Sequence, residues 1–367
     1  MIIGIDGNEA NTLERVGIGE YSFELLKKFE EFNPPKAEIK FKIYLKNKPV
    51  SDMPKEREGW SYVVFGPGRI WTQFALPLRL FTTKKPDIFF SPSHYGPRFS
   101  PVPTAISIMD LSYIHFPYMF NSRDLHQLKS WTAYSAKNAS LIFTISNSSK
   151  DDIINEYKLP ESRVVVTHLG IKPEVFENKV KDIKKKYKID SPFILFVGTL
   201  QPRKNIVRLV EAFSKLKQKN LKFVVVGKKG WQYEEILEAP EKYRVKDRVM
   251  FLDFVPDEDL AKLYKDALCF VLPSLYEGFG LPILEAMKYG CPVITSNVSS
   301  MPEAGGDAAL YVDPENVSDI AEKIEKLITD EKLRAELIEK GYKQVKKFSW
   351  EDTARKTLEE LEKLALK

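Results

Sequence analysis

Two glutamates, Glu277 and Glu285, flank a glycine-containing loop with seven residues between them. An apolar run ends just before this loop, and Pro282 suits the first turn of a helix because it has no amide hydrogen to leave unpaired. The simpler interpretation is a tight strand-to-helix turn with two surface glutamates. We favour a ligand site, because a helix N-terminus binds anions and hydroxyls through its free amides. Those amides are predicted to belong to Phe279, Gly280 and Leu281.

A second candidate segment carries two adjacent cations after a glycine. Gly198 follows the apolar run 193–197, and Arg203 and Lys204 come a few residues later. Arginine offers phosphate a planar fork of donors, whereas lysine offers a compact point charge. From these residues alone, a solvent-exposed basic turn without a ligand is as good an interpretation as a phosphate site. The position at the end of a predicted strand favours phosphate binding, because ligands of open α/β sheets bind beside the carboxyl ends of the strands.

The first half of the chain contributes less specific candidates. Gly17-Ile18-Gly19 lies between a predicted strand and a predicted helix, but Ser22 stands where a dinucleotide-binding fingerprint needs glycine. The backbone of this turn can still approach a phosphate. The spacing is equally consistent with a flexible turn that binds nothing. Asp110 follows another predicted strand and is expected to face the ligand. His94 and His115 fall in loops of the same half, where a lone histidine is more often structural.

Short apolar runs alternate with amphipathic stretches along the whole chain, which is typical of parallel α/β sheets. The pattern restarts near Pro192 after a charged stretch at 177–188, interpreted as a linker or surface helix. We therefore expect two doubly wound lobes at 1–175 and 176–349 and a final helix at 350–367 that packs back on the first lobe. Expected strands are 2–6, 40–45, 87–90, 104–108, 141–144, 164–167, 193–197, 223–226, 249–252, 268–272 and 293–294. Expected helices are 20–31, 71–81, 123–138, 146–157, 205–216, 258–266, 282–289 and 350–366.

The composition is that of an ordinary globular protein. A net charge of +5 from 56 basic and 51 acidic residues predicts no nucleic-acid partner, which would need a basic stripe on one face. The chain opens without a signal-peptide pattern, and no apolar run reaches the roughly 20 residues that span a bilayer. Cys269 and Cys291 lie in apolar surroundings and are expected to be buried thiols. These features favour a cytoplasmic protein, and they are compatible with peripheral contact at the inner face of the membrane.

Several catalytic motifs are missing from the sequence. It contains no Cys-x-x-Cys, His-x-x-x-His or Asp-x-Asp, so we predict no metal site and no metal requirement. It also lacks a Walker A loop and a Gly-x-Ser-x-Gly elbow, which argues against a P-loop enzyme and a serine hydrolase.

Together these segments resemble the retaining GT-B glycosyltransferases called glycosyl transferases group 1, over nearly the whole chain. The Glu-x7-Glu motif is matched by Glu277 and Glu285 with Gly278-Phe279-Gly280 between them, and the Gly-x-x-x-x-Arg-Lys turn by Gly198, Arg203 and Lys204. The segments 69–73 and 227–231 look like the mannosyltransferase-like subgroup. The resemblance implies two Rossmann-like lobes facing across a cleft, with the donor in the C-terminal lobe and the acceptor in the first.

The resemblance also implies a role for each matched residue. Glu285 would bind the ribose hydroxyls and Glu277 the hydroxyls of the donor sugar, while Arg203 and Lys204 would neutralise the diphosphate. The remaining donor contacts would come from backbone near Val255 for the base, from Gly17, Ile18 and Gly19 for the diphosphate, and from Gly198, Thr199, Gly278, Phe279, Gly280 and Leu281.

The chain departs from the family pattern at two positions. Thr199 stands where many members have arginine, and Arg203 would supply that charge from a neighbouring position. Met109 stands where many members have histidine, which leaves Asp110 or His115 to meet the acceptor or the transferred sugar.

The expected activity is transfer of a hexose with retention, from GDP-mannose in preference to a UDP-sugar, without metal or cofactor and without a protein nucleophile. The acceptor would be a glycan or lipid-linked oligosaccharide in polysaccharide biosynthesis. The alternatives are a UDP-sugar-dependent glucosyltransferase, another enzyme on the same two-lobe fold such as an epimerase or phosphorylase, and a non-catalytic nucleotide-sugar-binding protein.

Overall fold

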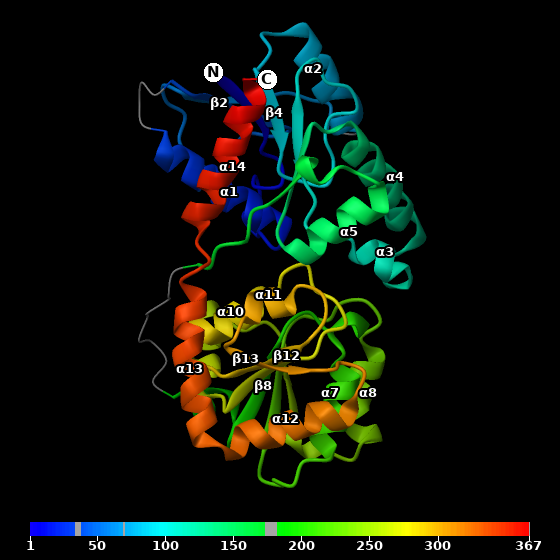
Figure 1. Cartoon of the computed structure of the whole chain (residues 1–367), viewed down its shortest axis with the longest axis vertical. Coiled ribbons are helices and arrows are strands. Elements are labelled where there is room, and N and C mark those ends of the chain that lie inside the picture. The colour runs from blue at the N-terminus through cyan, green and yellow to red at the C-terminus, as the bar shows by residue number, and fades with distance from the viewer. Residues whose placement is uncertain (34–37, 69, 173–181, 367) are drawn as a thin grey trace. The chain divides into compact units, whose positions relative to one another are not determined.

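The computed structural model describes residues 1–33, 38–68, 70–172 and 182–366, which form two compact units (Figure 1). Unit 1 comprises Met1–His115, Asn121–Gly170 and Ser349–Lys367, and unit 2 comprises Phe116–Phe120 and Ile171–Phe348. The expected boundary at 175/176, the first part of the expected linker and Arg69 lie outside the described residues.

Unit 1 is built on a seven-stranded, all-parallel sheet in the order β3-β2-β1-β4-β5-β6-β7. Every residue of β4, β5 and β6 is buried, as parallel strands covered on both faces require. The strands are β1 (Ile2–Asp6), β2 (Lys40–Leu45), β3 (Trp60–Val64), β4 (Ile88–Ser91), β5 (Thr104–Ser107), β6 (Leu141–Thr144) and β7 (Val164–Val166). The sequence did not predict β3, an edge strand whose partly exposed residues lack a continuous apolar run.

The helices of unit 1 begin at polar caps in several places. Asn121, Ser146 and Ser349 each accept a hydrogen bond from an amide in the first turn of the helix that follows. The helices are α1 (Ile18–Phe32), α2 (Leu76–Thr82), α3 (Ser112–His115), α4 (Ser122–Asn138), α5 (Asn147–Tyr157) and α14 (Trp350–Ala365), with a 3-10 turn η3 (Glu161–Arg163).

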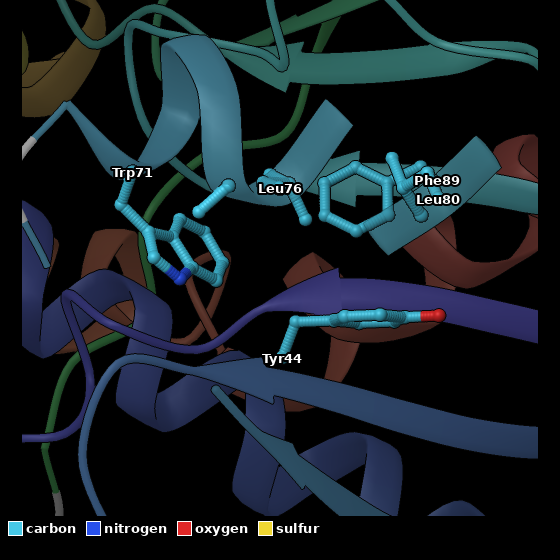
Figure 2. Packing of buried hydrophobic residues seen from close by; sticks show 6 residues of the cluster. Tyr44, Trp71, Leu76, Leu80 and Phe89 are labelled. Carbon is cyan, nitrogen blue, oxygen red and sulfur yellow. The ribbon is translucent and has the colours of Figure 1, made fainter. Parts of the chain in front are cut away.

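The expected helix at 71–81 is divided in the structure. A π-helical turn η1 (Trp71–Ala75) precedes α2, and Pro77 lies in the first turn of α2, where its missing amide hydrogen does no harm. The inner face of this segment packs on the sheet. Figure 2 shows Trp71, Leu76 and Leu80 around Tyr44 of β2 and Phe89 of β4.

Unit 2 has a six-stranded parallel sheet in the order β10-β9-β8-β11-β12-β13. Its strands are β8 (Phe193–Val197), β9 (Lys222–Val226), β10 (Val249–Leu252), β11 (Cys269–Leu272), β12 (Val293–Ser296) and β13 (Ala309–Val312), of which β13 was not predicted. Its helical elements are η2 (Pro117–Met119), α6 (Ile183–Tyr187), η4 (Pro202–Lys204), α7 (Ile206–Ser214), α8 (Glu234–Lys242), η5 (Lys246–Arg248), α9 (Asp257–Asp266), α10 (Leu281–Lys288), α11 (Met301–Gly305), α12 (Val317–Thr329) and α13 (Glu331–Val345). Both cysteines are buried free thiols, as predicted.

The C-terminal helix α14 belongs to unit 1, although unit 2 precedes it in the chain. It packs against α1, where the rings of Tyr21 and Trp350 lie 6.3 Å apart. The Thr353 hydroxyl donates to the carbonyl of His168 at 2.5 Å. A side chain at Gly170 would come within 2.1 Å of the Trp350 amide nitrogen, so only glycine allows this approach. The predicted fold class, two doubly wound parallel sheets with a final helix returning to the first, is confirmed.

Each sheet has a point where the strand order reverses. In unit 2 the chain builds β8, β9 and β10 in one direction and then β11, β12 and β13 in the other, so the reversal lies between β8 and β11. In unit 1 it lies between β1 and β4. Open α/β sheets bind ligands beside the strand ends at such points, which directs attention to the loops after β8 and β11.

Candidate active site

The turn after β8 depends on two glycines whose backbones lie close together. Gly198 and Gly227 have φ angles of 155° and 152°, and a side chain on Gly227 would come within 2.0 Å of the Gly198 carbonyl oxygen. The Gly198 amide donates to the Val226 carbonyl at 2.9 Å. This close approach fixes the start of the turn, so that Arg203 and Lys204 extend from a defined place in η4.

Asn205 connects this turn to the loop after β11. Its backbone is left-handed, with φ of 61°, and its buried side-chain amide donates to the carbonyls of Pro273 at 2.9 Å and Pro314 at 2.6 Å. The Leu275 amide in turn donates to the Arg203 carbonyl at 2.9 Å. The two strand ends beside the reversal are therefore held together by backbone and side-chain hydrogen bonds.

Glu277 lies at the centre of a buried ion-pair cluster. Lys204 Nζ donates to its Oε1 at 2.5 Å, and Arg203 Nη1 donates to its Oε2 at 2.9 Å. The Ser274 hydroxyl donates to Oε1 at 2.7 Å. The side chain of Glu277 is only 8% exposed, so these charge-assisted bonds replace the water that the carboxylate gives up. The structure thus brings together three of the predicted residues.

The backbone of Glu277 is held as firmly as its side chain. The hydroxyls of Ser299 and Ser300 donate to the Glu277 carbonyl at 2.7 and 2.8 Å. Ser299 has a φ of 57°, a costly conformation for a residue with a side chain. Strain of this kind is retained where the surrounding structure must fix a group in one position.

The electrostatics of the cluster keep the carboxylate ionised. Burial raises the pKa of Glu277, but the charges of Lys204 and Arg203 outweigh it and lower the pKa to about 2. At neutral pH two cations surround one anion, so the three side chains carry a net charge of +1. The cluster can therefore attract an anion while its own geometry stays fixed.

Glu285 has a different environment on the second turn of α10. The Tyr264 hydroxyl donates to its Oε2 at 3.3 Å, and burial raises the pKa of this glutamate above its ordinary value. The helix begins after Gly280, whose φ of 100° suits glycine, and Pro282 lies in its first turn as predicted. The helix N-terminus and Glu285 therefore offer a site for an anion and a site for hydroxyl groups on one element.

The other predicted donor contacts in unit 2 lie in loops or helix starts beside strand ends. Phe279 is buried, with its ring 5.4 Å from that of Phe348, so any contact it makes with a ligand would use its backbone. Val255 is buried in the loop after β10. Its neighbour Phe254 is exposed and lies 5.4 Å from the Lys228 ammonium. The ligand contacts assigned to these residues, and to Thr199, Gly278 and Leu281, stay predictions.

The loops of unit 1 hold the remaining candidates. Gly17 has a φ of 52° and precedes α1, and a side chain on Gly19 would lie 3.0 Å from the Glu9 carbonyl oxygen. These residues follow β1, at the reversal of the sheet. Ile18 is the first residue of α1.

Asp110 follows β5, one strand away from the reversal. Its Oδ1 accepts the Ser112 amide at 2.8 Å. His94, after β4, accepts the Met109 amide on Nε2 at 3.2 Å, so it contacts the position where the family usually has histidine. Burial lowers the pKa of His94, and the charge of Asp110 opposes this. His115 pairs with Asp152 at 3.1 Å. The role of Asp110 or His115 toward a substrate stays a prediction.

Four residues of the unit 2 site were not singled out from the sequence: Asn205, Ser274, Ser299 and Ser300. Ser274 had a usable signal, because it lies two residues after a strand end in the same loop as Glu277. The serines at 299 and 300 are far from Glu277 along the chain, and no local pattern links them to it.

Two absences can be stated for the described parts of the chain. Within residues 1–33, 38–68, 70–172 and 182–366, no three histidine, cysteine or acidic side chains gather closely enough to hold a metal ion. None of the helices formed by those residues combines the length and apolar character needed to cross a membrane. The expectation of metal-independent chemistry stays a prediction.

Comparison with known proteins agrees with this geometry. Residues 179–344 match the family model described as Glycosyl transferases group 1, so the chain carries a glycosyl transferases group 1 domain. It is 37% identical over 231 residues to O-antigen chain mannosyltransferase B of Escherichia coli, covering 61% of each chain. It is 35% identical over 231 residues to the serotype-specific mannosyltransferase WbdA of Escherichia coli, covering 60% of this chain and 28% of that protein. The chain thus spans less than two thirds of these relatives.

Solved structures share the fold over nearly the whole chain. Sucrose-phosphate synthase from Thermosynechococcus elongatus superposes with a TM-score of 0.75 at 18% identity, covering 99% of this chain and 98% of that one. WaaG, a glycosyltransferase involved in lipopolysaccharide biosynthesis, superposes with a TM-score of 0.70 at 16% identity, covering 97% and 98%. The two Rossmann-like units therefore form the GT-B type of fold.

Proposed function

We propose that this protein is a retaining glycosyltransferase that moves a hexose, mannose from GDP-mannose, to a glycan or lipid-linked acceptor in polysaccharide biosynthesis. The mannosyltransferase names of the relatives support the sugar and the pathway class. The observation that carries the proposal is the buried Glu277–Lys204–Arg203 cluster at the strand reversal of the matched domain.

The cluster suits the departure of a nucleoside diphosphate. Breaking the bond from the anomeric carbon to the phosphate oxygen places negative charge on the leaving group. Lys204 and Arg203, held by Glu277, supply fixed positive charge for it, and the amides at the start of α10 add oriented dipoles. Because these groups are already in position, little reorganisation is needed when the charge develops.

Glu285 is proposed to bind the ribose hydroxyls. A carboxylate accepts hydrogen bonds from two vicinal hydroxyls, and such bonds would compensate for the burial that raises the pKa of Glu285. Tyr264 orients the side chain from α9. The base would meet the loop after β10 near Val255.

We propose front-face attack by the acceptor hydroxyl, assisted by the departing phosphate, with no covalent sugar–protein intermediate. The new bond would form to the anomeric carbon on the side from which the phosphate leaves, so the configuration is retained. The carboxylate of Glu277 is occupied by two cations and a serine hydroxyl, which makes it a poor nucleophile. Its proposed part is to hold the cations and the sugar hydroxyls.

Thermal shift measurements with nucleotides test the donor site. We expect GDP and GDP-mannose to raise the melting temperature of the wild type, because a ligand at a hundredfold excess over its dissociation constant adds about 2.7 kcal/mol of stability. Glu285→Ala should abolish the shift, and the exposed-site control Glu241→Ala should keep it. A shift with UDP in place of GDP would support the UDP-sugar alternative, and no shift with any nucleotide would contradict the donor site.

Turnover then separates a transferase from a binding protein. With GDP-mannose and octyl α-mannoside we expect GDP release together with a new glycoside whose anomeric proton shows the configuration of the donor. Inverted product, or a sugar trapped covalently on Glu277 or Asp110, would contradict the mechanism. Nucleotide binding without turnover across a series of glycoside acceptors would favour the non-catalytic alternative.

A further inference from the structure

The segment η1–α2 of unit 1 is apolar on two opposite faces. Its inner face contributes buried residues to the cluster around Tyr44 and Phe89, as Figure 2 shows for Trp71, Leu76 and Leu80. A surface helix normally presents polar residues on the face away from the core. This one does not.

The outward side chains form what we call the outer stripe, defined as Ile70, Phe74, Leu78, Phe81 and Phe99. Each is between 55% and 69% exposed. Phe74, Leu78 and Phe81 are spaced by four and three residues along η1 and α2, which places them along one face, and Ile70 immediately precedes η1. Phe99 is close to the start of this segment, because the Arg98 amide donates to the Thr72 carbonyl at 3.1 Å. Exposed apolar side chains gathered in one region are a common feature of interaction surfaces.

The surrounding sequence is strongly basic. Residues 59–109 contain five basic residues and one acidic residue, Asp87. Lys84 and Lys85 follow α2 directly and are exposed. Asp87 leaves these residues with a formal net charge of +4, and its carboxylate accepts the amide of Ile2, at the start of β1, at 2.6 Å.

We propose that the outer stripe docks on an anionic lipid surface, with α2 lying in the interface and Lys84 and Lys85 near the headgroups. Helices with apolar residues on one side and flanking cations bind in this way. The segment is far too short to span a bilayer. A second copy of this chain is the less favourable occupant, since a two-fold interface would bring the same cations of both copies together.

This inference stands apart from the proposed transfer reaction, because it rests on the surface of unit 1 alone. If both hold, the stripe would bring the enzyme to the surface where a lipid-linked acceptor is embedded. Nucleotide binding in unit 2 should be the same in all variants of the stripe, so a failure of one proposal can be told from a failure of the other.

Vesicle sedimentation tests the proposal. We expect the wild type to bind vesicles of equal parts phosphatidylglycerol and phosphatidylcholine, and to bind pure phosphatidylcholine much more weakly. Phe74→Ser with Leu78→Gln should lower the partition coefficient at least about tenfold, since both side chains would insert. Lys84→Gln with Lys85→Gln should lower it by about tenfold on the anionic vesicles only. Leu366→Gln, the same change at an exposed leucine just after the end of α14, is the matched control and should bind as the wild type does.

Three results would overturn the proposal. One is wild-type protein that stays in the supernatant with both kinds of vesicle. Another is a Phe74→Ser, Leu78→Gln variant that partitions like Leu366→Gln. The third is a wild-type dimer in analytical ultracentrifugation that this variant abolishes while vesicle binding is unchanged, which would assign the stripe to a second copy. Because the changed side chains are exposed, the melting temperatures of the variants should match that of the wild type, which verifies folding.

Discussion

The strand ends of unit 2 are tied together by buried ion pairs, whereas several strand ends of unit 1 are held by hydrogen bonds of neutral side chains, from Ser22 to the Pro92 carbonyl and between Tyr21 and Ser107. In unit 2, Glu277 from the loop after β11 pairs with Lys204 and Arg203 from the turn after β8. In unit 1, Asp110 accepts an amide two residues away, and His94 accepts the Met109 amide from the neighbouring loop. The two sheets are similar in topology, and the ion cluster formed by Glu277, Lys204 and Arg203 lies at the reversal of unit 2.

The difference indicates that the charged groups of the unit 2 site are fixed in place before a ligand binds. A buried ion pair is costly to desolvate and is retained only with good geometry and further hydrogen bonds, which Ser274 supplies here. The desolvation cost of such a cluster is offset where the protein must bind the same charged ligand with charges held in fixed positions. The loops of unit 1 are suited to change between relatives, because loops on a rigid scaffold carry specificity.

Replacing Glu277 by glutamine should have the largest effect. It leaves Lys204 and Arg203 buried without their anion, which should destabilise the fold by about 3 kcal/mol or more. Transfer should fall about a hundredfold or more, because the cations lose their fixed geometry. Urea unfolding and turnover measure the two effects.

The matched control is Glu241→Gln, which breaks a Lys–Glu pair of similar length on the surface. Glu241 and Lys246 lie 3.0 Å apart with side chains 76% and 71% exposed. This variant should keep both stability and activity, since exposed pairs contribute little. If the two variants lost equal amounts of stability and activity, the Glu277 cluster would be no different from an exposed salt bridge.

The two glutamates of the site should give stability opposite dependences on pH. The folded pKa of Glu277 is lowered to about 2, so its contribution is present above its ordinary pKa of 4.5 and lost as the pH falls towards 2. That contribution amounts to about 3 kcal/mol. The destabilisation caused by Glu277→Gln should therefore shrink between pH 5 and pH 2 in urea unfolding experiments, by roughly this amount.

The folded pKa of Glu285 is raised, so the sign is reversed. Its neutral form contributes stability below its ordinary pKa of 4.5, and this is lost as the pH rises through the raised value. Glu285→Gln should thus gain stability relative to the wild type as the pH rises. If both variants change in the same direction over this range, the contrast between the two environments is wrong.

Asp110→Asn should have the smallest effect of the three. If Asp110 positions the acceptor or the transferred sugar, turnover should fall about tenfold while GDP affinity and the melting temperature stay the same. His115→Gln is the comparison for the other candidate, which pairs with Asp152. A loss of GDP affinity in Asp110→Asn would place this residue in donor binding instead of acceptor binding.

Much of the architecture could be predicted because strands and helices leave local patterns of apolar and polar residues in the sequence. The continuous apolar runs at 193–197 and 141–144 coincide with β8 and β6, as expected for strands buried on both faces. The strand β3 was missed because it lies at the edge of the sheet, where most of its residues are only partly buried, and because Ser61 interrupts its apolar residues. The division of 71–81 into η1 and α2 was missed because a proline shows that a helix is interrupted but not how the preceding turn adjusts.

The sequence predicted individual residues of the candidate site but not the hydrogen bonds that join them. Spacing located Glu277 and Glu285, and charge located Arg203 and Lys204. The contributions of Asn205, Ser299 and Ser300 were hidden, because their partners are far away along the chain or are backbone carbonyls.

Local patterns in the amino-acid sequence indicate where most strands end, where glycines permit tight turns, and which loops carry carboxylates and cations. Long-range packing brings Lys204 and Arg203 to Glu277 across more than seventy residues, whereas Glu285, eight residues further on, is paired with Tyr264. The reason is that residue types and backbone preferences are local, whereas a pKa depends on burial and on charges that are close in space. Two glutamates of one motif therefore have ionisation properties that no reading of the motif could separate.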